Sequence, residues 1–434
     1  MPPDAGIQIR EDPLPLPEHP QRPVLPPIGP SSLGRMFSAF RHYNFRVYFV
    51  GLLISVLGVW AQNVAQSWLV YRLTDSALVL GQVSFIVAIP VWLLSPWAGV
   101  VLDRVPRRAV LIITQIVFMI QATALALLDF SGIIMVWHIM ALSAVQGIAN
   151  AFDAPARQAF VVELVGKEDM SNGIALNSTM MSLARTFGPA IGGVIVAALG
   201  TAWGFTVNAV TYLAILVGLL MLRLDRPTPR PARRSPIQDL AQGLRYIGSS
   251  RAIIALMVIA LSIALFGGNF TVLMPVFAVE VLGKSAVEFG VLSGAVGLGA
   301  VLGALTVAYL SSQPGRGRFL NLVNMLFPIM LALFALSRSF WLSLVLLVLT
   351  GMTFMPQLSL CNMLIQSTIT DDVRGRVMSV YTLMIFGAFP VGGLIAGALA
   401  EALGAPTAIA ISAAAVALVS VTLHLVVPEL KDLE

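Results

Sequence analysis

The side chains with the clearest chemical potential form a short charged loop between two apolar segments. Asp103 is followed within five positions by three arginines, Arg104, Arg107 and Arg108, and Gly99 stands one helical turn before it. A carboxylate at a helix end is attracted to the positive N-terminal end of a neighbouring helix, and arginines bind carboxylates through paired hydrogen bonds. We therefore expect the loop to latch helices together; the alternative is a charged turn that only fixes topology.

A second candidate is a single cation inside an apolar segment. Arg185 lies near the middle of the stretch from 174 to 198. A cation within a membrane needs an anionic partner or a water-filled cavity, because an uncompensated charge there costs several kcal/mol. Arg185 either attracts an anionic group of a ligand or donates hydrogen bonds across a helix interface, and the sequence leaves both roles open.

Other reactive side chains are sparse. The chain has one cysteine, Cys361, and four scattered histidines, so we expect neither a disulfide nor a metal site. His138 is expected near a membrane interface rather than as a proton switch. No nucleophile with an adjacent base and no phosphate-binding motif is apparent, so we expect no enzyme activity and no cofactor.

Apolar helices must position these groups. Hydrophobic residues make up 58% of the chain and charged residues only 11%, whereas soluble domains carry roughly 25% charge. Stretches of about 18 to 25 apolar residues recur, which is the length of a helix that crosses a bilayer. The sequence predicts twelve spans, at approximately 47–70, 79–102, 109–128, 133–152, 174–198, 202–222, 252–279, 287–310, 319–336, 340–362, 376–400 and 405–427.

The distribution of positive charge predicts the orientation of these spans. Of 26 Lys and Arg residues, 22 fall in the tails or in alternate loops that share one side; the exceptions are Arg72, Arg185, Lys284 and Arg338. By the positive-inside rule that side is the cytoplasm, and both termini lie there. The net charge of +5 follows from this topology, so we expect a lipid bilayer and no nucleic acid as partner.

The two halves of the chain repeat. Ser, Ala, Gly and Ser recur at one spacing in segments 76–84 and 285–293, and Gly192-Gly193 recurs as Gly392-Gly393. An even number of spans per half makes the halves parallel repeats. The predicted units are a disordered Pro-rich tail at 1–40, a six-helix bundle at 41–222, a linker at 223–251 with a short amphipathic helix around Leu240, Leu244 and Ile247, and a second bundle with a short tail at 252–434.

The charged loop resembles the signature loop of the major facilitator superfamily, G-x-L-a-D-r-x-G-r-k, with Pro106 in place of the usual second Gly. The segment 185–193 is similar to the G-P-x-x-G-G packing motif of exporters in that superfamily, through Gly188, Pro189, Gly192 and Gly193. The run 150–160, which contains Asp153 and Arg157, resembles a bacterial subgroup of enterobactin-type siderophore exporters and macrolide or multidrug efflux proteins.

This resemblance implies an all-α membrane protein of twelve transmembrane helices in two pseudo-symmetric six-helix bundles. Spans one, four, seven and ten would line a central cavity, so their polar residues become candidates for substrate binding together with Arg185: Gln62, Gln66, Gln146, Asn269 and Gln357. Trp60, Phe266 and Phe354 would add apolar contacts. For each amide, the alternative is a hydrogen bond between helices.

Proton coupling rests on the resemblance alone. Related proteins carry an Arg tied to proton transfer three residues before a Gln-Gly pair, and Ser143 takes that place before Gln146-Gly147. The carboxylates of the spans lie toward their ends, where a solvated position is favoured over proton carriage: Asp153, Glu280, Glu288 and Glu401.

The sequence thus predicts a monomeric, multi-pass secondary transporter of the bacterial plasma (inner) membrane. It would export small organic molecules of the drug or siderophore class by alternating access, with protons as the coupling ion. Two alternatives stay open: an importer or lysolipid flippase of the same fold, and a non-transporting sensor or scaffold that docks through its Pro-rich tail.

Overall fold

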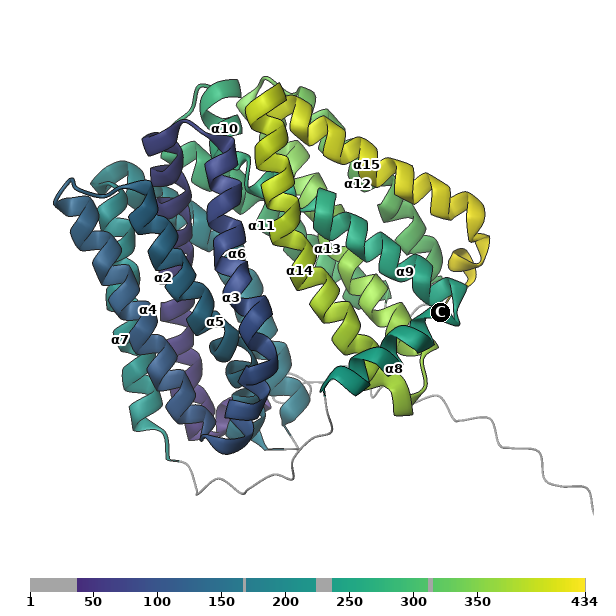
Figure 1. Cartoon of the computed structure of the whole chain (residues 1–434), viewed down its shortest axis with the longest axis horizontal. Coiled ribbons are helices and arrows are strands. Elements are labelled where there is room, and N and C mark those ends of the chain that lie inside the picture. Colours follow the sequence, from purple (N-terminus) through teal and green to yellow (C-terminus); the bar gives the residue numbers. More distant parts are fainter. Residues whose placement is uncertain (1–36, 167–168, 224–235, 311–314, 434) are drawn as a thin grey trace, which may run out of the picture.

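Long helices dominate the part of the chain that the computed structural model describes, residues 37–166, 169–223, 236–310 and 315–433. Residues 1–36 of the Pro-rich tail and residues 224–235 of the linker lie outside these ranges. After the 3-10 turn η1 (Ser38–Arg41), the first bundle contains α2 (Tyr43–Thr74), α3 (Ala77–Arg104), α4 (Arg107–Phe130), α5 (Val136–Val165), α6 (Met170–Leu199) and α7 (Thr201–Met221), as Figure 1 shows.

The second bundle follows α8 (Pro236–Gly248), a helix within the predicted linker that packs on the start of α14. Its first span is built from short pieces: α9 (Arg251–Ser262), the π-helical η2 (Ile263–Gly267), η3 (Asn269–Thr271), α10 (Met274–Val276) and η4 (Phe277–Val281). Five continuous helices follow: α11 (Ala286–Leu310), α12 (Arg316–Leu336), α13 (Phe340–Thr368), α14 (Asp371–Leu403) and α15 (Ala405–Val426). The 3-10 turn η5 (Pro428–Asp432) comes after them.

The broken seventh span differs from the continuous helix expected over 252–279. It contains the pair Gly267-Gly268, and Pro275 removes a backbone donor further on. A Cβ atom on Gly268 would lie 2.3 Å from the ring of Phe389, so only glycine fits where this span meets α14. The Asn269 side chain donates to the Leu265 carbonyl and replaces a backbone hydrogen bond at the break.

Eleven helices of the described chain are long and apolar enough to cross a membrane. The twelfth long helix is α5, which has 30 residues and carries the polar residues His138, Gln146 and Asp153 within its length. The prediction of an all-α membrane protein with twelve spans in two six-helix bundles is confirmed.

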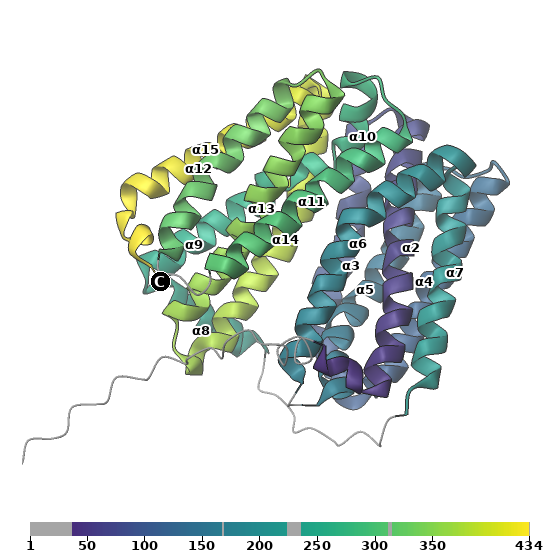
Figure 2. The same ribbon diagram turned by 180° about the vertical axis from the view of Figure 1, so that it is seen from behind.

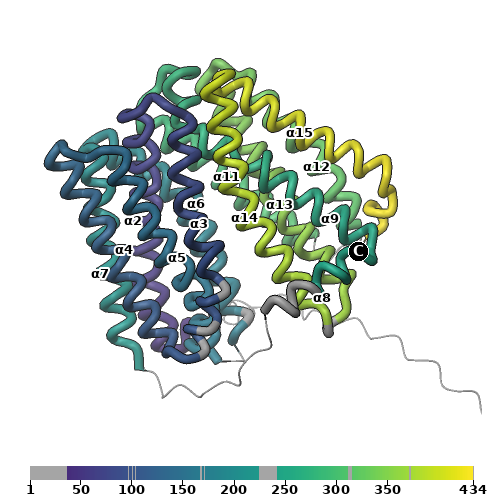
Figure 3. Tube along the Cα trace, viewed as in Figure 1, coloured from purple at the N-terminus to yellow at the C-terminus, as the bar shows by residue number. Residues whose placement is uncertain are grey.

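The two bundles lean together at one end and separate toward the other (Figures 1 and 2). The end at which they separate carries α8, and we call it the linker end; the end near α10 is the far end. The tube in Figure 3 shows that α3 and α14 approach each other at the far end and diverge below it. Gly99 and Gly375, near their linker ends, have open space where a side chain would begin.

Glycines bring the bundles into backbone contact along α6 and α11. A Cβ atom on Gly193 would lie 2.7 Å from the Ala286 carbonyl oxygen and 2.9 Å from the Gly290 Cα atom. One on Gly297, two turns further along α11, would lie 2.5 Å from the Thr186 Cα atom. Any side chain at these positions would push the helices apart, so the contact depends on glycine.

The pseudo-symmetric contact between α3 and α14 has the same construction. A Cβ atom on Gly81 would lie 2.6 Å from the Gly393 carbonyl oxygen, and one on Gly397 would lie 2.6 Å from the Ala77 carbonyl oxygen. Gly81 repeats as Gly290, and Gly193 repeats as Gly393. Four of the glycines that reveal the sequence repeat, Gly81, Gly193, Gly290 and Gly393, therefore lie where the two bundles touch.

Replacing Gly193 with Val should destabilise the protein by roughly 1 to 3 kcal/mol, because the added atoms overpack the α6–α11 contact. The measurement is the thermal unfolding midpoint of purified protein in detergent. Gly375→Ala is the matched control, since nothing lies within 4 Å of its Cβ position. Equal midpoints for Gly193→Val and the control would show that the close approach does not matter.

Candidate functional site

The first bundle contains a polar cavity of about 320 Å³ between α2, α3 and α5. Gln66 and Gln146, both expected to contact substrate, line it together, and Gln66 Nε2 donates to Ser143 Oγ at 3.1 Å. Ser143 is fully buried, so a neutral hydrogen bond occupies the position at which the resembling proteins carry an arginine. The remaining polar lining comes from residues that the sequence analysis did not single out: Asn63, Ser67 and Ser84.

Three of the predicted substrate-binding amides lie in the bundle cores instead. Gln62 is 2% exposed, donates to Gln121 Oε1 at 3.1 Å and accepts from Asn208 Nδ2 at 2.7 Å, which joins α2, α4 and α7. Asn269 is 2% exposed at the break in span seven, and Gln357 is fully buried and donates to the Thr353 carbonyl at 3.0 Å. Gln62 joins three helices, while Asn269 and Gln357 bond to the backbone of their own spans, because polar groups within a membrane need internal partners.

The expected apolar contacts also belong to packing. Phe354 is 6% exposed and packs against Phe327 and Phe389 in the second bundle. The Trp60 side chain fills the space beside Gly188, where a Cβ atom would lie 2.4 Å away, and Gly192 lies against Ala61. Gly188 and Gly192 thus seat α6 on α2 within the first bundle, while Pro189 and Gly193 meet α11 of the second.

Arg185 lies at the contact between the bundles. Its side chain is exposed and its Nη1 atom lies 3.7 Å from Met355 Sδ on α13, so it reaches across from α6 to the second bundle. Among the described residues, no carboxylate forms an ion pair with it. A cation held at mid-span without an acid is suited to meeting an anion in the space between the bundles.

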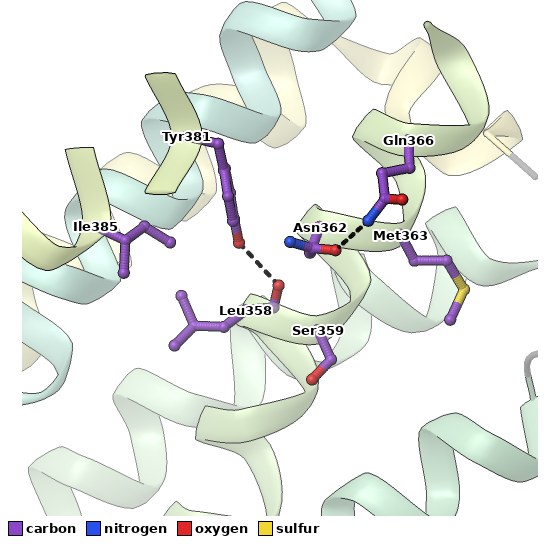
Figure 4. A pocket seen from close by; sticks show the side chains of 7 residues that line it. All are labelled: Leu358, Ser359, Asn362, Met363, Gln366, Tyr381 and Ile385. Atoms are coloured by element: carbon purple, nitrogen blue, oxygen red, sulfur yellow. Dashed lines mark hydrogen bonds between the residues drawn. The ribbon is translucent and has the colours of Figure 1, made fainter. Parts of the chain in front are cut away.

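A second cavity, of about 550 Å³, lies between α13 and α14. Figure 4 shows Tyr381 and Ile385 on α14 facing Leu358 and Asn362 on α13. Tyr381 donates its hydroxyl to the Leu358 carbonyl at 2.9 Å, which fixes the ring on the cavity wall. The other lining residues are Ser359, Met363 and Gln366, none of which the sequence analysis identified.

The charged loop makes its described contacts within the first bundle. Arg107 pairs with Glu163 and donates to the Ala159 carbonyl at 3.2 Å, both on α5. Arg108 donates to the Leu220 carbonyl on α7 at 2.9 Å, and Arg104 is exposed. Asp103 lies in the last turn of α3, but its side chain lies outside the described part. The described arginines therefore brace α4 against α5 and α7 in this conformation.

Asp153 and Arg157 form a buried ion pair one turn apart on α5. Their side chains are 8% and 17% exposed, and the Arg157 Nη2 atom lies 2.8 Å from Asp153 Oδ2. The other Asp153 oxygen accepts from Thr114 at 2.9 Å and from Gln115 at 2.7 Å. The solvated position expected for Asp153 is therefore corrected: the carboxylate is buried because α4 surrounds it with donors.

Two glutamates join the bundles at the far end. Tyr71 on α2 donates to Glu280 Oε1 at 2.7 Å. Glu401 at the end of α14 accepts from Ser76 Oγ at 2.9 Å and from the Leu78 backbone N–H at 3.3 Å. Each bond runs from the first bundle to a carboxylate of the second, so these glutamates hold the far end closed.

Two further residues singled out in the sequence serve local structure. Glu288 accepts from Ser285 within the first turn of α11, at 3.1 Å from the backbone nitrogen. His138 Nδ1 accepts from the Met135 backbone N–H at 3.0 Å at the start of α5. Both side chains therefore satisfy the free backbone donors of a helix N-terminus.

A two-bundle helical fold with a polar cavity in each bundle defines a membrane transporter of the major facilitator type. The chain belongs to the transmembrane secretion effector family, whose family model matches residues 35–434.

Curated relatives cover most of the chain at low identity. The staphyloferrin A transporter of Staphylococcus aureus is 26% identical over 83% of this chain and 90% of its own length. The multidrug efflux pump Tap of Mycolicibacterium fortuitum is 25% identical over 79% of this chain and 85% of its own. The enterobactin exporter EntS of Shigella boydii is 26% identical over 90% of this chain and 93% of its own.

Solved structures share the fold at lower identity still. The nucleoside transporter NupG superposes with a TM-score of 0.67 at 13% identity, over 87% of this chain and 97% of its own. A POT family transporter in complex with 5-aminolevulinic acid gives a TM-score of 0.69 at 12% identity, over 90% and 97% of the two chains.

Replacing Asp153 with Asn should destabilise the protein by about 3 to 5 kcal/mol, because it leaves the buried Arg157 guanidinium without its counter-charge. Chemical unfolding in detergent measures the loss. The double variant Asp153→Asn with Arg157→Gln should recover part of it, and Glu429→Gln on exposed η5 serves as the control. An Asp153→Asn protein as stable as wild type would refute the structural role of the pair.

Replacing Glu401 with Ala should loosen the far end, because Ser76 and the Leu78 backbone lose their common acceptor. Hydrogen bonds to charged groups are worth about 1.5 to 3 kcal/mol, so opening should become roughly tenfold more frequent or more. The measurement is the maleimide labelling rate of an Ala77→Cys variant, since Ala77 is 4% exposed and Cys361 is fully buried. A labelling rate unchanged from the Ala77→Cys parent would mean that Glu401 does not hold the far end closed.

Proposed function

We propose that the protein exports small organic molecules of the siderophore or drug class across the bacterial plasma membrane. The named functions of its relatives support this, since they include a siderophore transporter, a siderophore exporter and a multidrug efflux pump. The observation that carries the proposal is Arg185, an exposed cation at the contact between the bundles with no acid paired to it in the described chain.

The linker end faces the cytoplasm in this proposal, because the basic loops lie there. The described conformation is then open to the cytoplasm and closed outside by Glu280 and Glu401. Alternating access follows when the bundles rock about the α3–α14 and α6–α11 contacts, so that the far end opens as the linker end closes.

Proton antiport would supply the energy, through carboxylates that change partners during the cycle. Asp153 is unsuited to this role, because four hydrogen bonds within its own bundle satisfy it. Glu280 and Glu401 accept bonds that must break when the far end opens. Because these bonds alternate with the opening of the far end, we propose the two glutamates as the coupling groups.

Efflux from proteoliposomes with an imposed pH gradient tests the function. Enterobactin, staphyloferrin A and a cationic dye are the trial substrates, and we expect transport of at least one to require the gradient.

Arg185→Gln should lower transport of an anionic substrate about tenfold or more through loss of a charge-assisted contact, and should spare the dye. Arg338→Gln, at the far end, is the matched control. Gradient-independent or absent flux for all three would contradict the proposal.

A further inference from the structure

We propose that the cavity between α13 and α14 is a first binding site for the exported molecule, and that it takes small acids which carry amide or hydroxyl groups beside an aromatic ring. This inference rests on the proposed export function and adds a site and a substrate class to it. The site consists of Ser359, Asn362 and Gln366 on α13, with Tyr381 and Ile385 on α14 as the facing wall (Figure 4).

Three polar residues of α13, Ser359, Asn362 and Gln366, form one stripe with Met355 that ends beside Arg185. Met355, Ser359, Asn362 and Gln366 are spaced by four, three and four positions, which places them on one helix face. The stripe is about 16 Å long, given a rise of about 1.5 Å per residue. Gln366 lies toward the linker end, and Met355 lies 3.7 Å from Arg185 Nη1. A molecule that enters from the linker end meets the amides first and the cation last.

The amides of this stripe keep groups available for a ligand. Gln366 Nε2 donates to Asn362 Oδ1 at 2.6 Å, a bond that fixes the two side chains relative to each other. In the described chain the Asn362 nitrogen, the Gln366 oxygen and the Ser359 hydroxyl have no hydrogen-bond partner, and none of the three side chains is fully buried. The site therefore offers a donor, an acceptor and a hydroxyl side by side, which matches an amide or phenol.

The rest of the lining is apolar and aromatic. Tyr381 is held with its hydroxyl on the Leu358 carbonyl, so its ring presents a flat, fixed surface. Ile385, Leu358 and Met363 complete the wall. An aromatic ring of a ligand gains contact area with Tyr381 and with the thioether of Met363. In the described chain no cation lines the cavity itself, so a carboxylate has its attraction only at the Arg185 end of the stripe.

The test uses N-salicyloylglycine, which has a phenol, an amide and a carboxylate, together with its uncharged methyl ester. Full-length protein in lipid nanodiscs is titrated with each compound, and salicyl fluorescence reports the dissociation constant. We expect wild type to bind the acid more tightly than the ester. Asn362→Leu should weaken binding of both compounds by about tenfold, because it removes a hydrogen-bonding group from the cavity. Arg185→Gln should weaken only the acid and abolish the preference.

Thr382→Val is the matched control, since Thr382 is exposed on α14 next to Tyr381 but does not line the cavity. Thermal unfolding checks each variant, and Ser359→Val replaces Asn362→Leu if the latter does not fold. Three outcomes would overturn the site: no binding to wild type, equal affinity for acid and ester, or unchanged affinities in Asn362→Leu.

Failure of the site is distinguishable from failure of the proposed function. If vesicles transport a substrate while Asn362→Leu binds both compounds normally, export stands and this site is refuted. If the binding pattern appears but no trial substrate moves under a pH gradient, the site stands and the export function is refuted.

Discussion

The fold depends on backbone contact between two helix bundles, along α6 and α11 and along α3 and α14. We call these two contacts the glycine seams, because they are possible only with glycine on both of the facing helices. Side chains of any size at Gly193, Gly290, Gly81 or Gly397 would collide with the carbonyl or Cα atoms of the facing helix. Within a membrane, apolar side chains gain nothing from leaving lipid, so close packing of this kind is the main attraction between helices. Because glycine has no side chain, few side chains interdigitate at these contacts. Little packing would therefore be lost if one bundle rocked against the other.

The same lack of a hydrophobic driving force explains where the polar groups lie. Buried amides such as Gln62 bond helices within a bundle, where rocking of one bundle against the other would leave the bonds intact. Polar groups with hydrogen-bonding capacity to spare lie elsewhere, with Arg185 at the contact between the bundles and Asn362 in the cavity between α13 and α14. The residues that we propose to face substrate are therefore accessible, whereas the structural amides are buried. The far-end glutamates form an intermediate class, because their bonds join the bundles and would break in the proposed cycle when the far end opens.

Much of this architecture could be predicted from the sequence. Apolar stretches predicted the spans, and the repeat of Gly81 as Gly290 identified the pseudo-symmetry whose glycines form the seams. The substrate-facing residues were harder to predict. Gln62 and Gln66 lie one turn apart, only about 40° around the helix, yet one enters the core and the other a cavity. The break in span seven could not be predicted, because it depends on which helices pack against that span. The same is true of the positions of Asn362 and Gln366 in the cavity beside α14.

The central claim is that the two bundles pivot about the glycine seams, so that one end closes as the other opens. Spin-label distances measure this directly, in a Cys361→Ser background reconstituted into nanodiscs. One label pair replaces Val105 and Ser379 at the linker end, and a second replaces Ser131 and Leu403 at the far end. We predict that acidification or substrate shortens the linker-end distance and lengthens the far-end distance in the same population. Distances that change together in one direction, or do not change at all, would contradict the account.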